Sequence, residues 1–460
     1  MKLKKATAVS MAAVMTASMA TAGGASVVMA DDVVKYADIT LGEDYTDLKA
    51  DIKLLTNRTD MLDDDYSGKN WAAYLKEFNE MYPNINVEIE GITDYAEDSL
   101  LRLQGGDWGD IMMIPEVDKS DLSTYFLSYG DVDSVSEQVK YPNRWLYDGQ
   151  VYGIPITVVG RGVLYNKKVF EQAGITETPK TPDEFIEDLK LIKEKTDAIP
   201  LYTNYAAGWT MGAWDDYTGV AATGDAKFKN QEFAHTKNPF ADPGDGTGPY
   251  NVYKILYDAV ANGLTEEDYT TTDWESSKGM MNNGEIATMV LGSWAYPQMQ
   301  SAGDNVDDIG YFAFPITVDG KQYSPADEDY CFGINADSDA DTQTAAMVFV
   351  KWMTEKSQYS YNEGGLPIAV GDEQYPSVYD EFTANNVEFV SNEPAEEGEE
   401  DLLNELNADS ELMVSAGGNE KIQSIVEHAS NQDEDFDDIM NEWNEKWSDA
   451  QDADGVEVNE

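Results

Sequence analysis

Short apolar strands alternate with amphipathic helices along the first part of the chain. A mostly apolar run at 52–55 predicts a strand, and apolar residues then recur at helical spacing from Trp71 to Tyr82, where Pro83 ends the pattern. Alternating apolar and acidic residues at 87–90 predict the next strand. This strand, helix, strand order is typical of a parallel sheet.

The same alternation continues to the end of the chain. Residues Thr181 to Glu184 form a capping box with proline at the first helical position, which predicts the start of a helix. Further helices are predicted at 253–260, 345–353 and 436–447. Further strands are predicted at 111–114, 152–155, 162–165, 286–290 and 309–314. The fold class is therefore α/β, and 460 residues are more than one hydrophobic core usually organises, which favours two domains.

The two ends of the chain lack this periodicity. In residues 1–30, three lysines precede an acid-free stretch of small and apolar residues, which predicts a secretory signal peptide cut before Asp31. The alternative, an amphipathic first helix, would need a polar face that this segment lacks. The acidic and aperiodic segment 31–50 predicts a flexible leader, and residues 451–460 predict an acidic tail.

The predicted signal peptide indicates where the protein is found. No run after residue 30 approaches the ~20 apolar residues that a membrane span requires. Gly24 stands where a lipoprotein would carry its lipid-bearing cysteine, so lipid attachment has no acceptor there. We therefore expect an exported protein that is extracellular or associated with the cell envelope, and periplasmic if the organism has an outer membrane.

Charge and composition exclude several classes of function. Lys and Arg total 30 against 88 Asp and Glu, a formal net charge of −58, so a nucleic-acid partner would be repelled. The 42% hydrophobic fraction is too high for a disordered acidic chain. Cys331 is the one cysteine and the chain has two histidines, which nearly excludes Cys/His catalysis and zinc sites. We expect no cofactor.

A search for motifs that carry chemistry returns mostly negatives. The run from Asp63 to Gly68 begins like a calcium loop, but its twelfth position is Tyr74 instead of the required Glu, so a helix cap is favoured and no metal is expected. The tripeptide at 392–394, Asn-Glu-Pro, resembles the acid/base segment of many retaining glycosidases. Because it lies in an acidic low-complexity turn without a preceding strand, a secreted glycoside hydrolase remains only the alternative function.

An ordered series of short motifs carries a family resemblance. The series spans roughly residues 51–450, and the chain resembles family 1 extracellular solute-binding proteins, the sugar-capturing components of ABC importers. The motifs are the runs at 104–111, 150–155, 162–170, 181–185, 284–294 and 435–447. The resemblance implies a non-catalytic receptor that holds a sugar, expected to be an oligosaccharide, and delivers it to the transmembrane subunits of an ABC permease. It also implies a monomer.

The resemblance further implies a two-lobed, periplasmic-binding-protein-like (Venus flytrap) fold that closes on its ligand at a hinge. The Gly364–Pro367 segment is interpreted as part of that hinge. The N-terminal lobe would comprise 51–160 plus 329–366, and the C-terminal lobe 161–328 plus 367–450.

Aromatic residues are the first candidates for the ligand site, because sugars present flat C–H faces that stack on aromatic rings. Trp294, which follows the 286–291 strand region, lies where similar proteins place a stacking tryptophan, with a core position as the alternative. Trp209 and Tyr205 follow a short strand at 200–202 and are equally consistent with the ligand site and with packing. Trp108 could serve either role.

Polar candidates come from the segment after the first strand and from the hinge. Asn57, Arg58 and Asp60 directly follow a strand, and loops at strand carboxyl ends face the crevice in α/β proteins. Asp60 is the preferred polar candidate, with helix capping as the alternative. Arg161 lies at the expected hinge, where an ion pair between lobes is as consistent with its position as ligand contact. Four tryptophans on helical stripes are predicted to be core: Trp71, Trp352, Trp443 and Trp447. Trp274, beside two acidic residues, is predicted to be a surface or packing residue.

Overall fold

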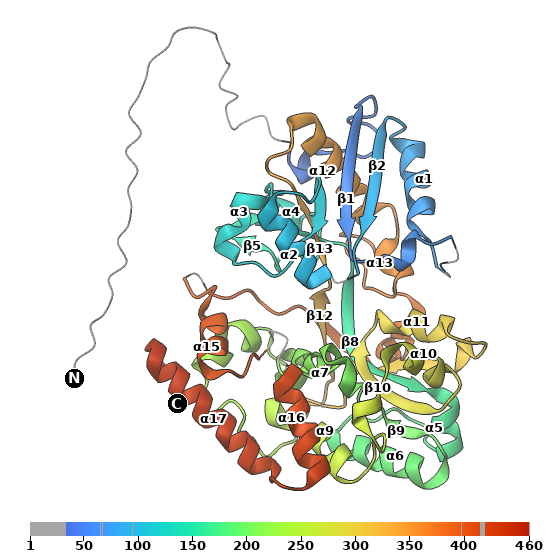
Figure 1. The fold of residues 1–460 in the computed structure, drawn as a ribbon, viewed down its shortest axis with the longest axis vertical. Helices are drawn as coiled ribbons and strands as arrows, with labels where there is room; N and C mark the ends of the chain where they lie inside the picture. The colour runs from blue at the N-terminus through green and yellow to red at the C-terminus, as the bar shows by residue number, and fades with distance from the viewer. Residues whose placement is uncertain are drawn as a thin grey trace. The chain divides into compact units, whose positions relative to one another are not determined.

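Two mixed β-sheets, each covered by helices, organise the chain (Figure 1). The structure is a computed structural model, and it describes residues 34–64, 66, 68–93, 95–396, 398–414 and 419–459. The predicted signal peptide at 1–30 lies outside the described residues. Both sheets belong to one unit, Val34–Glu460.

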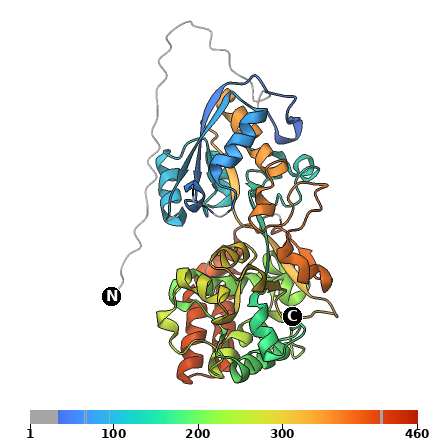
Figure 2. The same cartoon turned by 90° about the vertical axis from the view of Figure 1, so that its right-hand side faces the viewer.

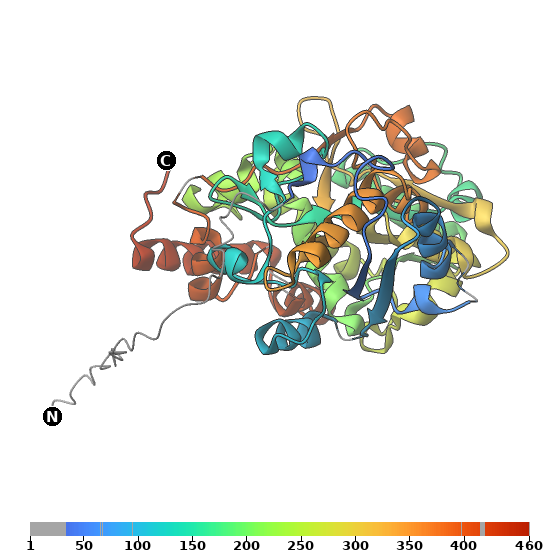
Figure 3. The ribbon, with the colours of Figure 1, turned by 90° about the horizontal axis from the view of Figure 1, so that it is seen from above.

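The first sheet confirms the strand, helix, strand unit predicted at the start of the chain. Its strand order is β2 (Ile85–Gly91), β1 (Ala50–Thr56), β3 (Ile111–Met113), β13 (Cys331–Ile334) and β7 (Ile154–Pro155). β1 runs parallel to β2 and β3, whereas β13 is antiparallel to β3 and β7. Helix α1 (Trp71–Met81) connects β1 to β2, and α12 (Ala340–Glu355) packs on β1. Seen from above, α12 lies beside these strands (Figure 3).

The second sheet is built around β8 (Val158–Asn166). Its order is β14 (Glu388–Val390), β12 (Tyr323–Glu328), β8, β10 (Ile286–Gly292) and β9 (Ile199–Leu201), with β11 (Ile309–Phe312) also paired to β8. β8 begins four residues earlier than the predicted 162–165 strand. Gly160 and Gly162 interrupt its apolar pattern because the sheet is tight there: a Cβ on Gly162 would lie 2.4 Å from the Phe312 carbonyl oxygen.

Helices surround both sheets. Thr181 caps α6 as predicted, since its hydroxyl accepts from the Glu184 N–H at 3.3 Å. The helices around the second sheet are α5 (Lys167–Ala173), α6 (Pro182–Lys195), α7 (Trp209–Gly212), α8 (Val220–Thr223), α9 (Gly248–Ala261), α10 (Trp274–Asn282), α11 (Ala295–Ser301), α14 (Asp380–Ala384), α15 (Leu402–Ser410), α16 (Asn419–Asn431) and α17 (Phe436–Asp454). The other helices are α2 (Tyr95–Gly105), α3 (Leu122–Tyr125), α4 (Val132–Ser136) and α13 (Tyr359–Asn362). A small sheet contains β4 (Gly130–Asp131), β6 (Gln150–Val151) and β5 (Leu146–Tyr147).

The chain passes between the two sheets through adjacent extended segments, which gives the predicted two-lobed α/β arrangement (Figure 2). The segment between β7 and β8 pairs with the segment between β12 and β13: Ile156 N–H donates to the Tyr330 carbonyl at 2.9 Å, and Asp329 N–H donates to Thr157 at 3.0 Å. The returning chain joins them through Leu366 N–H and the Val158 carbonyl at 2.7 Å. These hydrogen-bonded crossings form the hinge.

The predicted core tryptophans are confirmed. Trp71 and Trp352 are buried in the cluster around the first sheet. Trp443 and Trp447 are buried in a second cluster, where α9, α16 and α17 pack against one another. Periodicity on long helices thus identified the buried faces correctly.

The prediction of a flexible leader is wrong for residues 34–50. Tyr36 is fully buried, packs its ring edge-on against Tyr129 at 6.1 Å, and accepts a hydrogen bond from Lys351 Nζ through its carbonyl oxygen at 3.1 Å. The buried Tyr36 anchors this segment, although the acidic composition of the segment predicts flexibility.

Two predicted boundaries also shift. The segment after the third crossing stays beside the first lobe, because Lys140 N–H donates to Ile368 and Val370 N–H donates to Gln138, both at 2.9 Å. At the other end, α17 continues to Asp454, and Asn459 N–H donates to the His235 carbonyl at 2.7 Å. The described part of the acidic tail is therefore packed against the second lobe.

Candidate functional site

Three tryptophans meet beside the loops that follow β9 and β10. Trp209 begins α7, Trp274 begins α10, and Trp294 lies between β10 and α11. The ring centroids of Trp209 lie 5.3 Å from Trp274 and 5.6 Å from Trp294, and the last two rings are 5.7 Å apart. The Trp209 side chain is 44% exposed, whereas the other two residues are partly buried. We call these three residues the tryptophan cluster, and it offers an aromatic surface that a ligand can reach.

Glycines allow the chain to present these rings. Gly208, directly before Trp209, has a left-handed φ of 71°, a conformation that other residues rarely adopt. A Cβ on Gly292 would lie 2.7 Å from Trp294 Nε1 and 3.2 Å from Arg161 Nη1. Only glycine therefore lets the Trp294 indole and the Arg161 guanidinium lie so close to the end of β10.

Helix α16 braces the segment that carries Trp209. Gln423 Nε2 donates to the Tyr205 carbonyl at 3.0 Å, and Asn419 Oδ1 accepts from the Gly212 N–H at 3.2 Å. Between them, Lys421 Nζ contacts both Asp215 carboxylate oxygens, at 2.7 and 2.9 Å, with both side chains almost completely buried. Burial lowers the pKa of Lys421, while Asp215 favours its charged form. The ion pair thus fixes α16 to the 3-10 turn Ala213–Tyr217, which directly follows the helix that begins at Trp209.

Tyr205 participates in this bracing contact. Its hydroxyl hydrogen-bonds Glu427 on α16, and its ring lies edge-on to Tyr269 at 4.5 Å. Burial, with Glu427 nearby, raises the pKa of the hydroxyl above its ordinary value. The structure therefore places the Tyr205 side chain in contact with α16, and its role as a stacking residue stays a prediction.

Arg58 lies in the loop after β1, as predicted, but protein groups engage its guanidinium. Its Nε and Nη2 donate to the two oxygens of Asp60, each at 2.9 Å. Nη1 donates to Glu363 at 2.8 Å and to Tyr359 at 3.2 Å, and Nη2 also donates to Tyr66 at 2.8 Å. Burial opposes the charge, but these neighbours outweigh it and raise the pKa of Arg58. All five N–H donors have partners, so Arg58 orders the loop.

Asp60 and Asn57 remain open to a ligand. The Asp60 carboxylate is held by Arg58, yet its side chain is 51% exposed, so the lone pairs that Arg58 leaves can accept further hydrogen bonds. Asp60 also begins a short 3-10 turn without capping it through its side chain. Asn57 is partly buried and accepts a long 3.5 Å contact from Thr56 Oγ1. Both residues stay candidates for polar ligand contacts.

The hinge joins the Arg58 loop to the tryptophan cluster. A Cβ on Gly364, next to Glu363, would lie 3.1 Å from the carbonyl oxygen of Ser293, the residue before Trp294. The Tyr379 hydroxyl lies 2.7 Å from Ser293 Oγ and accepts from the Gly160 N–H at 2.9 Å. Polar groups of the first lobe and aromatic groups of the second therefore meet at the hinge.

Arg161 lies on β8 and forms ion pairs within the second lobe instead of the anticipated pair between lobes. Its Nη1 contacts Asp216 at 3.0 Å and its Nε contacts Asp327 at 3.3 Å. The guanidinium also lines a cavity of about 390 Å³ beside α15, which we call the α15-side cavity. Glu116, Lys119, Asn143 and Arg144 line it from the first lobe.

Trp108 does not belong to the site. Its side chain is 3% exposed and packs against Phe126 at a centroid distance of 5.5 Å in the first-lobe core. Because a buried ring has no face to offer a sugar, the interpretation of Trp108 as a ligand residue is wrong. Nearby Asp110 supports the turn, accepting from Lys53 N–H at 2.9 Å and Ser338 Oγ at 2.7 Å.

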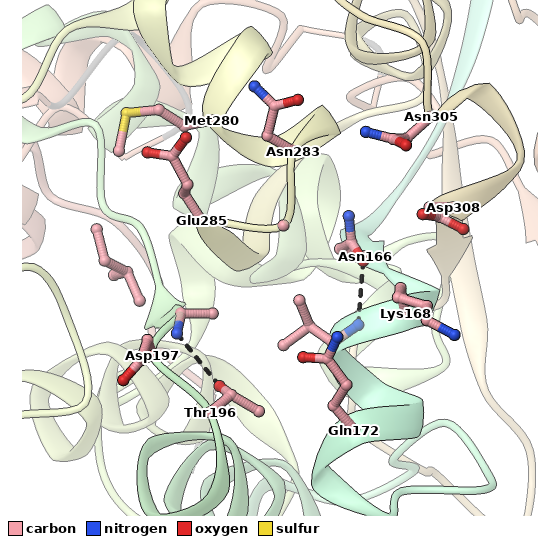
Figure 4. A pocket seen from close by; sticks show the side chains of 14 residues that line it. Asn166, Lys168, Gln172, Thr196, Asp197, Met280, Asn283, Glu285, Asn305 and Asp308 are labelled. Carbon is pink, nitrogen blue, oxygen red and sulfur yellow. Dashed lines mark hydrogen bonds between the residues drawn. The ribbon is translucent and has the colours of Figure 1, made fainter.

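A larger cavity of about 670 Å³ lies at the end of the second sheet where β8 ends and β9 and β10 begin (Figure 4). Both amide atoms of its Asn166 are used: Oδ1 accepts from Val169 N–H at 3.1 Å, and Nδ2 donates to the Met281 carbonyl at 2.9 Å. None of the described residues that line it is aromatic. This cavity lacks the stacking surface of the tryptophan cluster.

A buried carboxyl group at the hinge should make stability depend on pH. Glu328, at the end of β12, is 8% exposed, and burial raises its pKa to about 7. The stability gained from its protonated form is complete below the unfolded pKa of 4.5 and is lost as pH rises through 7. Glu328→Gln keeps the neutral form, so its stability relative to the natural protein should rise between pH 5 and pH 8, by roughly 3 kcal/mol at most. Thermal unfolding of both proteins at the two pH values measures this. An equal difference at both pH values would show that Glu328 does not titrate abnormally.

Within the described ranges, no group of three or more His, Cys, Asp or Glu side chains could hold a metal ion. In the same part of the chain, every helix is too short or too polar to cross a membrane.

Comparison with known proteins identifies the family. The chain matches the bacterial extracellular solute-binding protein family over residues 63–359 and belongs to it. Family membership confirms the resemblance drawn from the ordered motifs, and it agrees with the two-lobed fold. Because the family consists of solute-binding proteins, the chain is a binding protein and not an enzyme. The glycosidase-like Glu393 lies in the chain after β14, 3.9 Å from Lys227.

Among solved structures, two binding proteins from Bifidobacterium animalis subsp. lactis ATCC 27673 are similar over 91% of this chain and 99% of theirs. BlMnBP2, a manno-oligosaccharide specific solute binding protein in complex with mannotriose, is 56% identical with a TM-score of 0.87. BlMnBP1, a binding protein of an ABC transporter in complex with mannobiose, is 55% identical with the same TM-score of 0.87. The diacetylchitobiose binding protein DasA of Streptomyces coelicolor is 58% identical over 172 residues, 37% of this chain and 38% of DasA.

Proposed function

We propose that this protein is the extracellular receptor of an ABC importer and that it captures a manno-oligosaccharide between its two lobes. The tryptophan cluster carries the proposal, because its exposed aromatic surface suits the C–H faces of a sugar and Trp294 directly follows Ser293, which lies against the hinge residue Gly364. The similarity to two manno-oligosaccharide binding proteins over 91% of the chain supports mannose as the sugar.

Calorimetric titration of the exported chain with mannobiose, mannotriose and diacetylchitobiose tests the proposal. We expect the two mannose ligands to bind more tightly than diacetylchitobiose, and no products to form on long incubation. Tighter binding of diacetylchitobiose would reassign the sugar. Hydrolysis beyond one equivalent per protein would replace a receptor with an enzyme.

Export, partners and assembly complete the proposal. The composition of residues 1–30 supports export by a signal peptide, and the family is extracellular. The expected partners are the sugar and the transmembrane subunits of an ABC permease, with the receptor acting as a monomer and binding no nucleic acid. The strongly negative charge supports the last point.

Ligand binding should close the lobes. We propose lobes of 34–156 plus 330–376 and of 157–329 plus 377–459, which keep Tyr36 and Ile368 with the first sheet and Asn459 with the second. The segments at 156–157, 329–330 and 376–377 would then bend as the sugar is enclosed. Adding saturating mannotriose should lower the radius of gyration in solution scattering, and diacetylchitobiose should lower it less. An unchanged profile with mannotriose bound would exclude closure of an open form.

A further inference from the structure

The α15-side cavity has polar walls from both lobes. Its 390 Å³ lies within the roughly 300–1,000 Å³ typical of small-molecule sites. Arg144 of the first lobe, one of its lining residues, donates to the Asp329 carbonyl at 2.8 Å and to Glu116 at 2.7 Å. The cavity is therefore attached directly to a hinge crossing, where a ligand would touch both lobes.

Three buried acceptor atoms lining this cavity have no hydrogen-bond donor among the described residues: Glu328 Oε1, Asn392 Oδ1 and Asn407 Oδ1. The amide nitrogens of the two asparagines are engaged, Asn407 Nδ2 with the Val414 carbonyl at 2.7 Å and Asn392 Nδ2 with Asp327 at 3.3 Å. Glu328 and Asn407 are 8% and 2% exposed. Leaving buried acceptors without donors is costly, so a suitable occupant must donate several hydrogen bonds.

The charged residues that line the cavity indicate which class of ligand can occupy it. Besides Glu328, whose pKa burial raises to about 7, five acidic residues line it: Glu116, Asp216, Asp327, Glu399 and Glu400. Four basic residues line it: Lys119, Arg144, Arg161 and Lys229. The acidic excess disfavours an anion, while the cations can donate to a neutral acceptor. Hydroxyl groups both donate and accept, so a neutral polyhydroxylated ligand fits both sets of groups.

Arg161 connects the cavity to the tryptophan cluster. It lines the cavity, and the position of a Cβ on Gly292 lies within 3.2 Å of its Nη1 and within 2.7 Å of Trp294 Nε1. Arg161 therefore approaches the end of β10 beside Trp294 and also forms part of the cavity wall, so the tryptophan cluster and the cavity are neighbours at this guanidinium.

We propose that the α15-side cavity is a second sugar compartment, in which Glu328, Asn392 and Asn407 accept hydrogen bonds from a ring beyond those held by the tryptophan cluster. This inference rests on the proposed function and adds a preference for ligand length. The compartment favours the trisaccharide over the disaccharide, and it disfavours uronate rings because of its acidic excess.

Titration of three single variants with mannobiose and mannotriose tests the compartment. In Asn392→Ala and Asn407→Ala, mannotriose affinity falls about three- to tenfold, the loss of one hydrogen bond, while mannobiose affinity changes less than twofold. Asn305→Ala, in the cavity of Figure 4, serves as the matched control and changes neither affinity. Melting temperatures without sugar are measured for each variant. If Asn407→Ala is destabilised because it loses the hydrogen bond to the Val414 carbonyl, the mannotriose and mannobiose affinities of Asn392→Ala decide the test.

Each outcome decides between this inference and the proposed function. Equal losses for both sugars, or no loss for either, overturn the second compartment while leaving the receptor function standing. The same holds if the natural protein binds the two sugars equally, because the cavity would then hold water only. Failure of the natural protein to bind either sugar contradicts the proposed function, and the compartment falls with it.

Discussion

Replacing Trp209 by alanine should weaken manno-oligosaccharide affinity by roughly 30- to 1,000-fold, the 2–4 kcal/mol that a central aromatic anchor contributes. The ring is 44% exposed and touches Trp274 and Trp294, so its removal takes away a stacking surface and little core packing. The melting temperature of the sugar-free protein should therefore change little. Calorimetry and thermal unfolding on the same preparation measure both quantities.

Two comparisons make the Trp209 experiment specific. Trp294→Ala should lower both affinity and stability, because Trp294 is partly buried against the end of β10. Tyr45→Ala, which removes an aromatic side chain of similar exposure (39%) from the N-terminal segment, should leave affinity unchanged. Unchanged affinity in Trp209→Ala and Trp294→Ala, with a lower melting temperature only in the latter, would assign the cluster to packing.

Replacing Lys421 by methionine should destabilise the protein by about 3–5 kcal/mol, the typical cost of breaking a buried ion pair. The Lys421 and Asp215 side chains are 4% and 1% exposed, so water cannot replace the lost ammonium group. Because this pair fixes α16 to the Trp209 segment, sugar affinity should fall as well. Chemical denaturation measures the stability, and calorimetry below the new melting temperature measures the affinity.

The control for Lys421 is Lys446→Met, which removes an exposed ion pair with Glu442 on α17. Its effect should stay below ~1 kcal/mol, since exposed pairs contribute little. Asp215→Leu combined with Lys421→Met should be less destabilised than Lys421→Met alone, because no buried carboxylate remains. A Lys421→Met protein as stable as the control would refute the bracing role of the pair.

Periodicity predicted most long elements and missed those that tertiary contacts define. The helix at Trp71–Met81 and the capped helix after Thr181 follow from apolar spacing and local capping, which are visible in sequence. β8 extends through Gly160 and Gly162, which lower local strand propensity but are required where Tyr379 and Phe312 press on the sheet. Such close approaches depend on partners distant in the chain.

The candidate site was predicted only in part for the same reason. Trp294 was proposed from the family resemblance and Trp209 from its place after a strand, and the structure brings their rings together. Trp274 was predicted to be a surface or packing residue, and its contact with the other two tryptophans was not anticipated, since separations of 65 and 20 residues carry no periodic signal. Arg58 was placed in the correct loop, but the partners that occupy its donors include Tyr359 and Glu363, about 300 residues away. Sequence proximity to a strand end locates a loop and does not determine which side chains remain free.

A crystal structure of the protein with mannotriose would show where the sugar binds. We expect one sugar ring in contact with Trp209 and Trp294, Asp60 or Asn57 hydrogen-bonded to a hydroxyl, and the lobes closed around the ligand. Mannotriose bound in the polar cavity of Figure 4, or anywhere without contact to the tryptophan cluster, would contradict this expectation.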